Sequence, residues 1–262
     1  MKIQIIHSTQ YFYDEPVKKS IQCLRLTPQT LAHQRVLMWQ LSLPRLSEEI
    51  YDGFGNYCTM LNLTEPHSVL NIHAQGMVEI DDHSEYNTDN RISPLVFLNS
   101  SNLTRCNAAM HDFAETQTGG RTDRNGLIRL SRAIVEHMPY TADTTNTATT
   151  AATAFTKGSG VCQDHTHVFV ACARALGIPA RYVSGYLSTD DDAHLASHAW
   201  AEACLHGQWY VFDTTNQLFQ PNQHVQLAVG LDYNDTAPIR GIRQGGGEER
   251  MEFLVQVMKM IQ

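Results

Sequence analysis

Long apolar runs are missing from this sequence. No stretch approaches the ~18 consecutive apolar residues that a membrane-spanning helix requires. The first residues, Met1–His7, alternate in polarity like a strand and contain neither the longer apolar segment nor the cleavage site of a secretory signal. We therefore expect no membrane partner and a cytoplasmic location.

Positive charge is also scarce. The 262 residues include 19 Lys and Arg against 27 Asp and Glu, which gives a formal net charge of -8. Nucleic-acid binding relies on clustered Lys and Arg that contact phosphates, so this composition argues against a nucleic-acid partner. Charged residues make up 18% and hydrophobic residues 42% of the chain, which indicates a globular protein of one large or two smaller domains.

Closely spaced ligand motifs are absent as well. The six cysteines are scattered without a CxxC pair, and we expect them to be free thiols. His194 and His198 have an i, i+4 spacing, but Leu195 stands where a zinc motif of the HExxH type needs Glu. Asp190–Asp192 lack the spacing of a calcium-binding loop and are predicted to form a solvated loop. We expect neither a metal nor a cofactor.

The chain begins instead with a β-rich region. Residues 1–85 contain short β-prone runs separated by prolines, and Asp52–Asn56 between two of these runs is a strong turn signal. This spacing predicts an antiparallel, sandwich-like domain. Residues 86–125 are predicted to be a helical or irregular connector, and residues 126–262 a catalytic core with C-terminal strands.

The last region mixes helix and strand signals. Val161–Leu176 has the length of a helix, and Gly177 follows as a stop signal. Residues 181–187 predict a strand, two further strands are joined at His206-Gly207, and Met251–Met260 predicts the last strand. The chain as a whole therefore has the pattern of an α+β protein.

Cys162 stands at the start of the predicted helix, after Gly158 and Gly160. The nucleophilic form of cysteine is the thiolate, and the unpaired N–H groups and positive dipole end of a helix N-terminus stabilise its negative charge. The two glycines leave room for the close approach of a substrate backbone. A single Cys is more often a buried structural residue, but His198 and Asp213 downstream favour a reactive thiol here.

The hairpin after Cys162 provides a geometric test of this set. If His206-Gly207 forms a two-residue loop, Leu205 faces Gln208, and His198 and Asp213 become diagonal neighbours on one face of the sheet, ~7–8 Å apart at the backbone. A three-residue loop would place them on opposite faces. We predict that Asp213 holds one imidazole nitrogen and leaves the other nitrogen for the thiol.

Acyl transfer is the reaction that these residues predict. The thiolate of Cys162 attacks an amide or ester carbonyl, His198 protonates the leaving amine, and water or an amine resolves the thioester. The backbone N–H of Cys162 is one donor to the oxyanion. The candidates for contact with substrate, of which the first two are also candidates for a second oxyanion donor, are Gln163, Trp200 and Tyr186.

The motifs around these residues resemble those of the bacterial transglutaminase-like superfamily, which includes candidate cysteine proteases. The resemblance covers roughly residues 126–220 as the core, and residues 1–85 resemble the β-rich domain that precedes this core in such proteins. The segments that carry the resemblance are Gly160–His165, Arg174–Tyr186, Ser197–Glu202 and Phe212–Asn216 in the core, with Tyr11–Tyr13, Leu24–Pro28 and Asp52–Asn56 before it and Leu227–Tyr233 and Gly245–Glu248 after it.

The resemblance implies a papain-like, transglutaminase-like core in which a helix carrying Cys162 packs on an antiparallel sheet. It also implies a Cys-His-Asp triad of Cys162, His198 and Asp213. Two residues depart from the family pattern: His165 replaces an aromatic residue after Cys-Gln-Asp, and Thr214 replaces the Pro that follows the Asp. Neither belongs to the triad, but His165 is expected to alter the substrate groove or the surroundings of Cys162.

Two functional hypotheses follow. We favour hydrolysis of peptide-type amide bonds in a protein or peptide substrate over transamidation, because no feature of the sequence identifies an amine acceptor site. The alternative is a catalytically idle module that binds peptides or partner proteins through the same groove.

Overall fold

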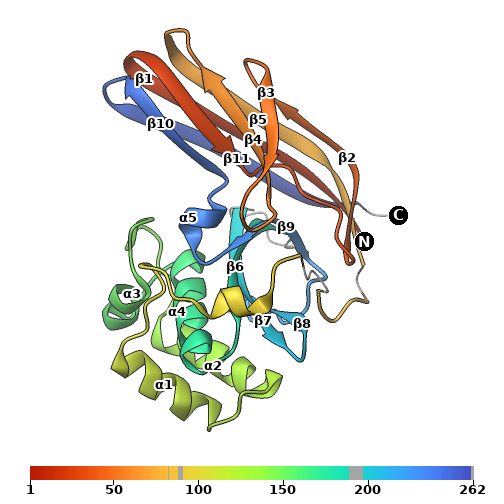
Figure 1. Cartoon of the computed structure of the whole chain (residues 1–262), viewed down its shortest axis with the longest axis vertical. Helices are drawn as coiled ribbons and strands as arrows, with labels where there is room; N and C mark the ends of the chain where they lie inside the picture. The colour runs from red at the N-terminus through yellow and green to blue at the C-terminus, as the bar shows by residue number, and fades with distance from the viewer. Residues whose placement is uncertain (82, 88–90, 189–196, 261–262) are drawn as a thin grey trace.

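Two antiparallel sheets organise the fold, one in the upper and one in the lower half of Figure 1. The computed structural model describes residues 1–81, 83–87, 91–188 and 197–260. The upper sheet contains β1 (Lys2–Leu24), β2 (Gln34–Ser42), β3 (Ser47–Tyr51), β4 (Tyr57–Leu63), β5 (His67–Ile80), β10 (Ile239–Gly245) and β11 (Glu249–Met260).

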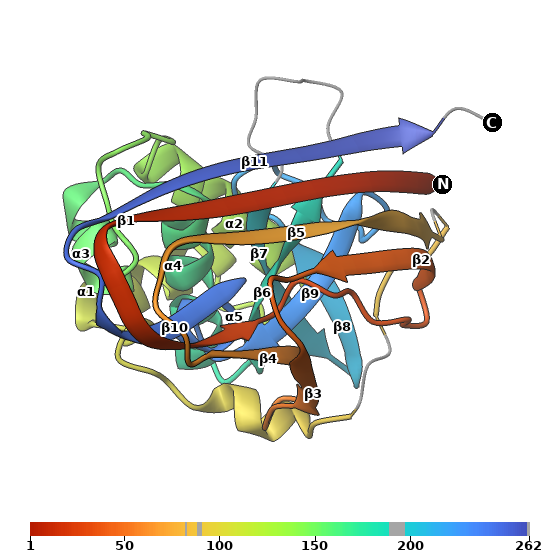
Figure 2. The same ribbon diagram turned by 90° about the horizontal axis from the view of Figure 1, so that it is seen from above.

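The long strand β1 belongs to both layers of this upper sheet. Its first half pairs with β5 and β11, its second half pairs with β4 and β10, and the register with β5 shifts between Phe12 and Val17. The view from above shows β1 turning back under itself (Figure 2). Leu70 and Ile72 of β5 and Leu61 of β4 belong to one buried cluster between the layers. The predicted antiparallel, sandwich-like region is therefore present.

The C-terminal strands lie in a different place from the one predicted. The sequence assigns them to the catalytic core, but β10 pairs with Val17–Leu24 and β11 pairs with Lys2–Tyr13, both in β1 (Figure 2). The alternation of residues in Met251–Met260 predicts a strand but carries no information about its partner. The partner is set by the edges of β1, more than 200 residues earlier in the chain.

Four helical segments lie in the chain between the upper sheet and the helix that begins with Cys162. They are the 3₁₀ helix η1 (Pro94–Leu98), α1 (Ala108–Thr118), α2 (Arg124–His137) and α3 (Ala151–Lys157). The side chains of Asn107 and Asp123 cap α1 and α2 by accepting hydrogen bonds from Met110 N and Gly126 N, at 2.9 and 2.7 Å. Both helices pack against α4 (Cys162–Ala175), the helix that follows α3, and help to bury it.

The lower sheet has the strand order β8-β7-β6-β9 and carries α4 on one face (Figure 1). Its elements are α4 (Cys162–Ala175), β6 (Ala180–Leu187), β7 (Ser197–Leu205), β8 (Gln208–Phe212), β9 (His224–Gly230) and the short α5 (Tyr233–Thr236). The eleven residues from Asp164 to Arg174 are all buried, so α4 is a central helix. Among the described residues, no helix is long and apolar enough to span a membrane.

The hairpin between β7 and β8 has the predicted two-residue loop. Leu205 pairs with Gln208, and His206 and Gly207 both have left-handed backbone angles, with φ of 52° and 79°. Two successive positive φ values are the mark of a type I′ turn, whose twist matches that of the flanking strands. The predicted register is therefore confirmed, and with it the relative placement of the residues at the two strand ends.

Candidate active site

Cys162 is the first residue of α4 and is partly exposed. The helix start is held by Asp164, whose Oδ2 accepts hydrogen bonds from the backbone N–H of Val161 at 2.8 Å and from the Thr145 hydroxyl at 2.6 Å. A Cβ at Gly160 would lie 2.6 Å from Asp164 Cβ, so this position has room for glycine only. The local sequence thus presents a thiol at an accessible helix N-terminus.

His198 and Asp213 lie next to each other, as the hairpin register predicts. His198 Nε2 donates to Asp213 Oδ2 at 2.9 Å, and the His198 side chain is 8% exposed while that of Asp213 is fully buried. Cys162 also lies near enough to the imidazole to raise its pKa. Because Nε2 is occupied by Asp213, Nδ1 is the nitrogen left for the thiol. The structure therefore brings Cys162, His198 and Asp213 together.

The charges of this cluster support one another. Burial by itself lowers the pKa of His198, but the charge and hydrogen bond of Asp213, together with Cys162, raise that pKa to about 10. Burial by itself raises the pKa of Asp213, but His198 and then His224 hold it well below its usual range. At neutral pH the pair is an imidazolium and a carboxylate, and the imidazolium stabilises the negative charge of a thiolate beside it.

Two further residues contact Asp213 and were not anticipated from the sequence. Asn216 donates its backbone N–H to Asp213 Oδ1 at 3.1 Å and its side-chain amide to Oδ2 at 3.0 Å, and His224 Nε2 lies 3.1 Å from Oδ2. The spacing Asp-x-x-Asn is a local signal that could have identified Asn216. No local pattern points to His224, since it reaches Asp213 only through the path of the chain from β8 to β9.

The three candidate substrate residues have different surroundings. Gln163 lies next to the nucleophile, and its amide donates to the carbonyl of Asn146 at 3.4 Å. Trp200 is 1% exposed, and its ring lies 6.2 Å from the ring of His198 at an interplanar angle of 22°. Its indole N–H has no hydrogen-bond partner within the described ranges. Trp200 therefore supports His198 from inside the protein and does not form an open groove wall.

Tyr186 is not part of the site. It is 1% exposed, and its hydroxyl bonds to His7 Nδ1 at 2.8 Å. It packs in a cluster with residues of the upper sheet, including Ile3 and Val78. The sequence places Tyr186 on a strand near the catalytic residues, but its side chain is covered by the N-terminal region and is unavailable to a substrate.

The two departures from the family pattern are buried inside the core. His165 forms hydrogen bonds with the Thr215 hydroxyl at 3.0 Å and with the Met138 carbonyl at 2.7 Å, and burial lowers its pKa. Thr214 is 1% exposed and accepts a hydrogen bond from Ser131 at 3.2 Å. His165 thus links α4 to the segment after Asp213 and does not line an exposed groove.

Tyr140 is an exposed aromatic residue at the site that the sequence analysis missed. It is 56% exposed, forms a parallel bridge with Gly160, and is followed by Thr141, whose N–H donates to the Gly160 carbonyl at 2.9 Å. Burial and then the nearby Cys162 raise the pKa of Tyr140. The segment around Tyr140 therefore runs alongside the approach to the nucleophile.

The metal prediction has one relevant observation. His198, Asp213 and His224 each offer a ligand atom, and these atoms lie within 4.8 Å of one another. The same atoms already form the hydrogen bonds given above, which account for their closeness. His194 and the predicted acidic loop, Asp190–Asp192, lie outside the described residues.

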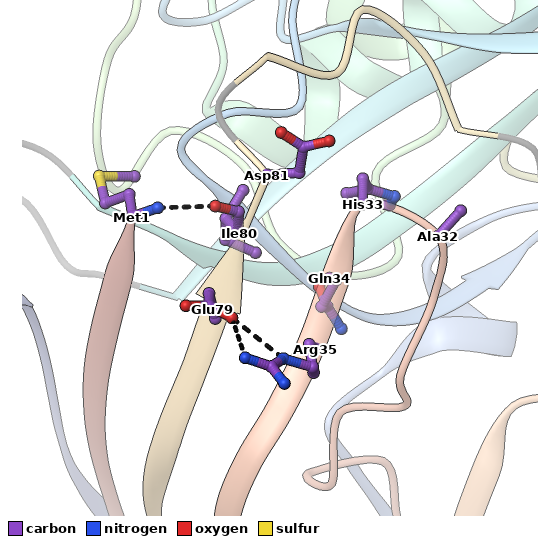
Figure 3. Close-up of a pocket in the computed structure, with 8 residues that line it drawn as sticks. All are labelled: Met1, Ala32, His33, Gln34, Arg35, Glu79, Ile80 and Asp81. Atoms are coloured by element: carbon purple, nitrogen blue, oxygen red, sulfur yellow. Dashed lines mark hydrogen bonds and ion pairs between the residues drawn. The ribbon is translucent and has the colours of Figure 1, made fainter.

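A hollow of about 370 Å³ lies elsewhere, at the ends of β1, β2 and β5 (Figure 3). Its polar groups are paired: Arg35 Nε donates to Glu79 at 3.0 Å, and the N-terminal amine donates to the Ile80 carbonyl at 2.8 Å. None of its lining residues belongs to the Cys162 cluster, by which we mean Cys162, His198 and Asp213, or forms a hydrogen bond with a member of it. The hollow therefore belongs to the upper sheet and has no place in the chemistry of the site.

Known proteins with similar sequences span nearly the whole chain. A functionally uncharacterised protein of Mycobacterium leprae is 28% identical over 279 residues, covering 99% of both chains. A similar protein of Mycobacterium tuberculosis is 27% identical over 273 residues, covering 92% of this chain and 87% of its own. A structure from Cytophaga hutchinsonii, described as a "Putative Cysteine Protease", has a TM-score of 0.82 at 23% identity and covers 100% of this chain and 91% of its own.

Two family descriptions match consecutive parts of the chain. Residues 3–79 match the bacterial transglutaminase-like N-terminal region, and residues 111–214 match the core of the transglutaminase-like superfamily. The second match contains all three residues of the Cys162 cluster and the first contains most of the upper sheet. The chain therefore carries a region that matches the transglutaminase-like core, preceded by a region that matches the bacterial transglutaminase-like N-terminal region.

Proposed function

We propose that this protein is a thiol-dependent acyl-transfer enzyme that cleaves peptide-type amide bonds. The observation that carries the proposal is the series Cys162, His198 and Asp213 at the start of a buried helix, in which His198 is hydrogen-bonded to Asp213 and has its pKa raised by both neighbours. A reactive thiol needs a base within hydrogen-bond reach and a third group that orients the base, and this series supplies both.

The reaction proceeds through a thioester. The thiolate of Cys162 attacks the carbonyl carbon, and the oxyanion that forms accepts a hydrogen bond from the backbone N–H of Cys162, which as the first helical residue has no intrahelical acceptor. His198 gives its proton to the departing amine, then takes a proton from the water that attacks the thioester. Asp213 keeps the ring oriented and stabilises its charged form throughout.

The acyl part of the substrate is proposed to lie along the exposed side chain of Tyr140, whose backbone pairs with the buried Gly160. An extended peptide could use backbone groups of this segment, and the Tyr140 ring offers apolar contact area next to the nucleophile. Gln163, the residue after Cys162, contacts the Asn146 carbonyl of the loop that precedes α3. This lining favours a peptide over a small polar substrate.

The experiment is a screen of peptide and isopeptide libraries with the wild type and with Cys162→Ser, which keeps the shape of the residue but removes the thiolate. We expect cleavage by the wild type only, with an acyl adduct on Cys162 detectable by intact-mass measurement after an acid quench. Repeating the reaction with a primary amine in excess distinguishes the acceptors, because hydrolysis yields the free acid and transamidation the amide. Equal binding of peptides by both proteins without any turnover would support the idle binding module instead.

A further inference from the structure

Asp213 lies between two imidazoles that come from different strands. His198 of β7 and His224 of β9 both place Nε2 on the same carboxylate oxygen, Oδ2, at 2.9 and 3.1 Å. Asn216 donates to both oxygens of the same group. The proposed mechanism uses only the first of these imidazoles, so the second has no role in it so far.

His224 is buried in a way that leaves Asp213 as its main polar partner. It is 1% exposed, and its other ring nitrogen, Nδ1, has no hydrogen-bond partner in the part of the chain that the structure describes. A buried imidazole with an unpaired nitrogen is costly unless its remaining hydrogen bond is strong, and a bond to a carboxylate is of the strong, charge-assisted kind. Since Asp213 oxygens are acceptors, His224 Nε2 is the donor in this contact.

The indole ring of Trp200 packs against both imidazoles. Its ring lies 4.7 Å from that of His224 and 6.2 Å from that of His198. A Cβ at Gly185 of β6 would lie 2.8 Å from the Trp200 ring and 2.1 Å from the Val225 carbonyl, so the glycine is what lets the indole pack closely against this strand. The three rings and the carboxylate therefore form one packed unit, in which a rotation of Asp213 would require His224 to move.

We propose that His224 is a positioning residue for the reaction at Cys162, which fixes the Asp213 carboxylate by a second imidazole hydrogen bond and so fixes the ring of His198. The inference rests on the proposed function. His224 does not touch the substrate, because it is buried; it acts through Asp213 and His198. Loss of its donor leaves the carboxylate with a free lone pair in a buried place and with freedom to turn away from His198.

The test compares His224→Gln with His224→Met by the rate at which iodoacetamide alkylates Cys162. The two side chains have similar lengths, but only Gln has an N–H that can donate to Asp213. Each rate is expressed per reactive thiol, titrated on the same sample, so that an unfolded fraction does not enter. We expect the Met variant to react about 10- to 100-fold more slowly at pH 6, and the Gln variant to recover most of the wild-type rate.

The pH dependence separates positioning from a general loss of packing. The titratable groups around Asp213 are His198, His224, His165 from α4 and, beyond His198, Cys162. The pKa of His198 is raised to about 10, so the imidazolium persists through neutral pH and is lost above pH 10, where the position of the ring no longer affects the charge on the sulfur. The deficit of the Met variant is therefore expected to shrink as the pH rises.

His7→Leu is the matched control. His7 is also a buried histidine with hydrogen bonds from both ring nitrogens, but it lies in β1 and contacts Tyr186 and Thr9. It is expected to reduce the amount of folded protein and leave the rate per thiol unchanged. Equal rates for wild type and His224→Met would overturn the inference alone, whereas a wild-type Cys162 no faster than in His198→Ala would overturn the proposed function and the inference with it.

Discussion

Asp164 accepts a hydrogen bond from the backbone N–H of Val161 at 2.8 Å, and this contact fixes the first turn of the helix that begins with Cys162. The carboxylate also lies where the positive end of the helix dipole is strongest. Asp164, the last residue of the Cys-Gln-Asp motif, therefore fixes the backbone of the helix N-terminus that carries the thiol.

The first prediction concerns Asp164→Ala. Loss of an N-terminal cap of this kind costs about 0.5–2 kcal/mol in the free energy of unfolding, and here the Thr145 hydroxyl also loses its acceptor. We expect chemical denaturation to show a loss in the upper part of that range and slower alkylation of Cys162. Asp123→Ala, which removes the cap of α2, is the control: its stability should fall and the alkylation rate of Cys162 should not.

The second prediction ranks two members of the triad. His198→Ala removes the base and acid and should lower kcat by about 10³-fold or more, whereas Asp213→Ala leaves the imidazole in place and should cost less. Asn216 and His224, which would lose their acceptor, remain beside the ring in the second variant. Steady-state kinetics with one cleaved peptide measures both, and a larger loss for Asp213→Ala would reverse the assigned roles.

The helix at Cys162 and the hairpin after it were predictable because their signals are local. Gly177 ends the first with a φ of 76°, and the two-residue loop at His206-Gly207 sets the register of the second. Once that register is known, the closeness of His198 and Asp213 follows from the pleat of a sheet. The core of the candidate site was therefore within reach of the sequence alone.

The remaining features depend on contacts that no local pattern encodes. The pairing of β11 with β1 joins residues at opposite ends of the chain, and the side chain of Tyr186 is covered by the upper sheet. His224 reaches Asp213 only because the segment between β8 and β9 crosses the end of the sheet. Each of these is decided by tertiary packing, which the alternation of polar and apolar residues constrains only weakly.

The third prediction is a dependence of stability on pH. The pKa of His198 is raised from 6.5 to about 10 in the folded protein, so its protonation stabilises the fold fully below pH 6.5, and this stabilisation is lost as the pH rises toward 10. Asp213 behaves in the opposite way, since its lowered pKa gives stability above its usual titration range that is lost on acidification. The pair is therefore most stabilising near pH 5–6.

Thermal unfolding of the wild type and His198→Gln checks this sign. We expect the wild type to have a Tm higher by at least about 3 °C at pH 6 and expect the difference to narrow steadily between pH 6.5 and 10. Since Gln does not titrate, the narrowing reports the proton on His198. A difference that widens toward pH 10 would show that His198 is neutral in the folded protein.

The last prediction concerns substrate binding by Tyr140. Its ring is 56% exposed beside the Gly160 segment, so it contributes apolar contact area without any part in the triad. We expect Tyr140→Ala to raise KM for a cleaved peptide by about tenfold, which corresponds to the burial of a ring against substrate, and to leave the alkylation rate of Cys162 by iodoacetamide within a factor of about two. The small reagent needs no groove, so the two measurements separate binding from reactivity.

Tyr51→Ala is the control, because Tyr51 is 68% exposed on β3 of the upper sheet and should leave both quantities unchanged. If Tyr140→Ala slowed the alkylation of Cys162 and left KM unaltered, Tyr140 would be a residue that supports the thiol and not one that binds substrate.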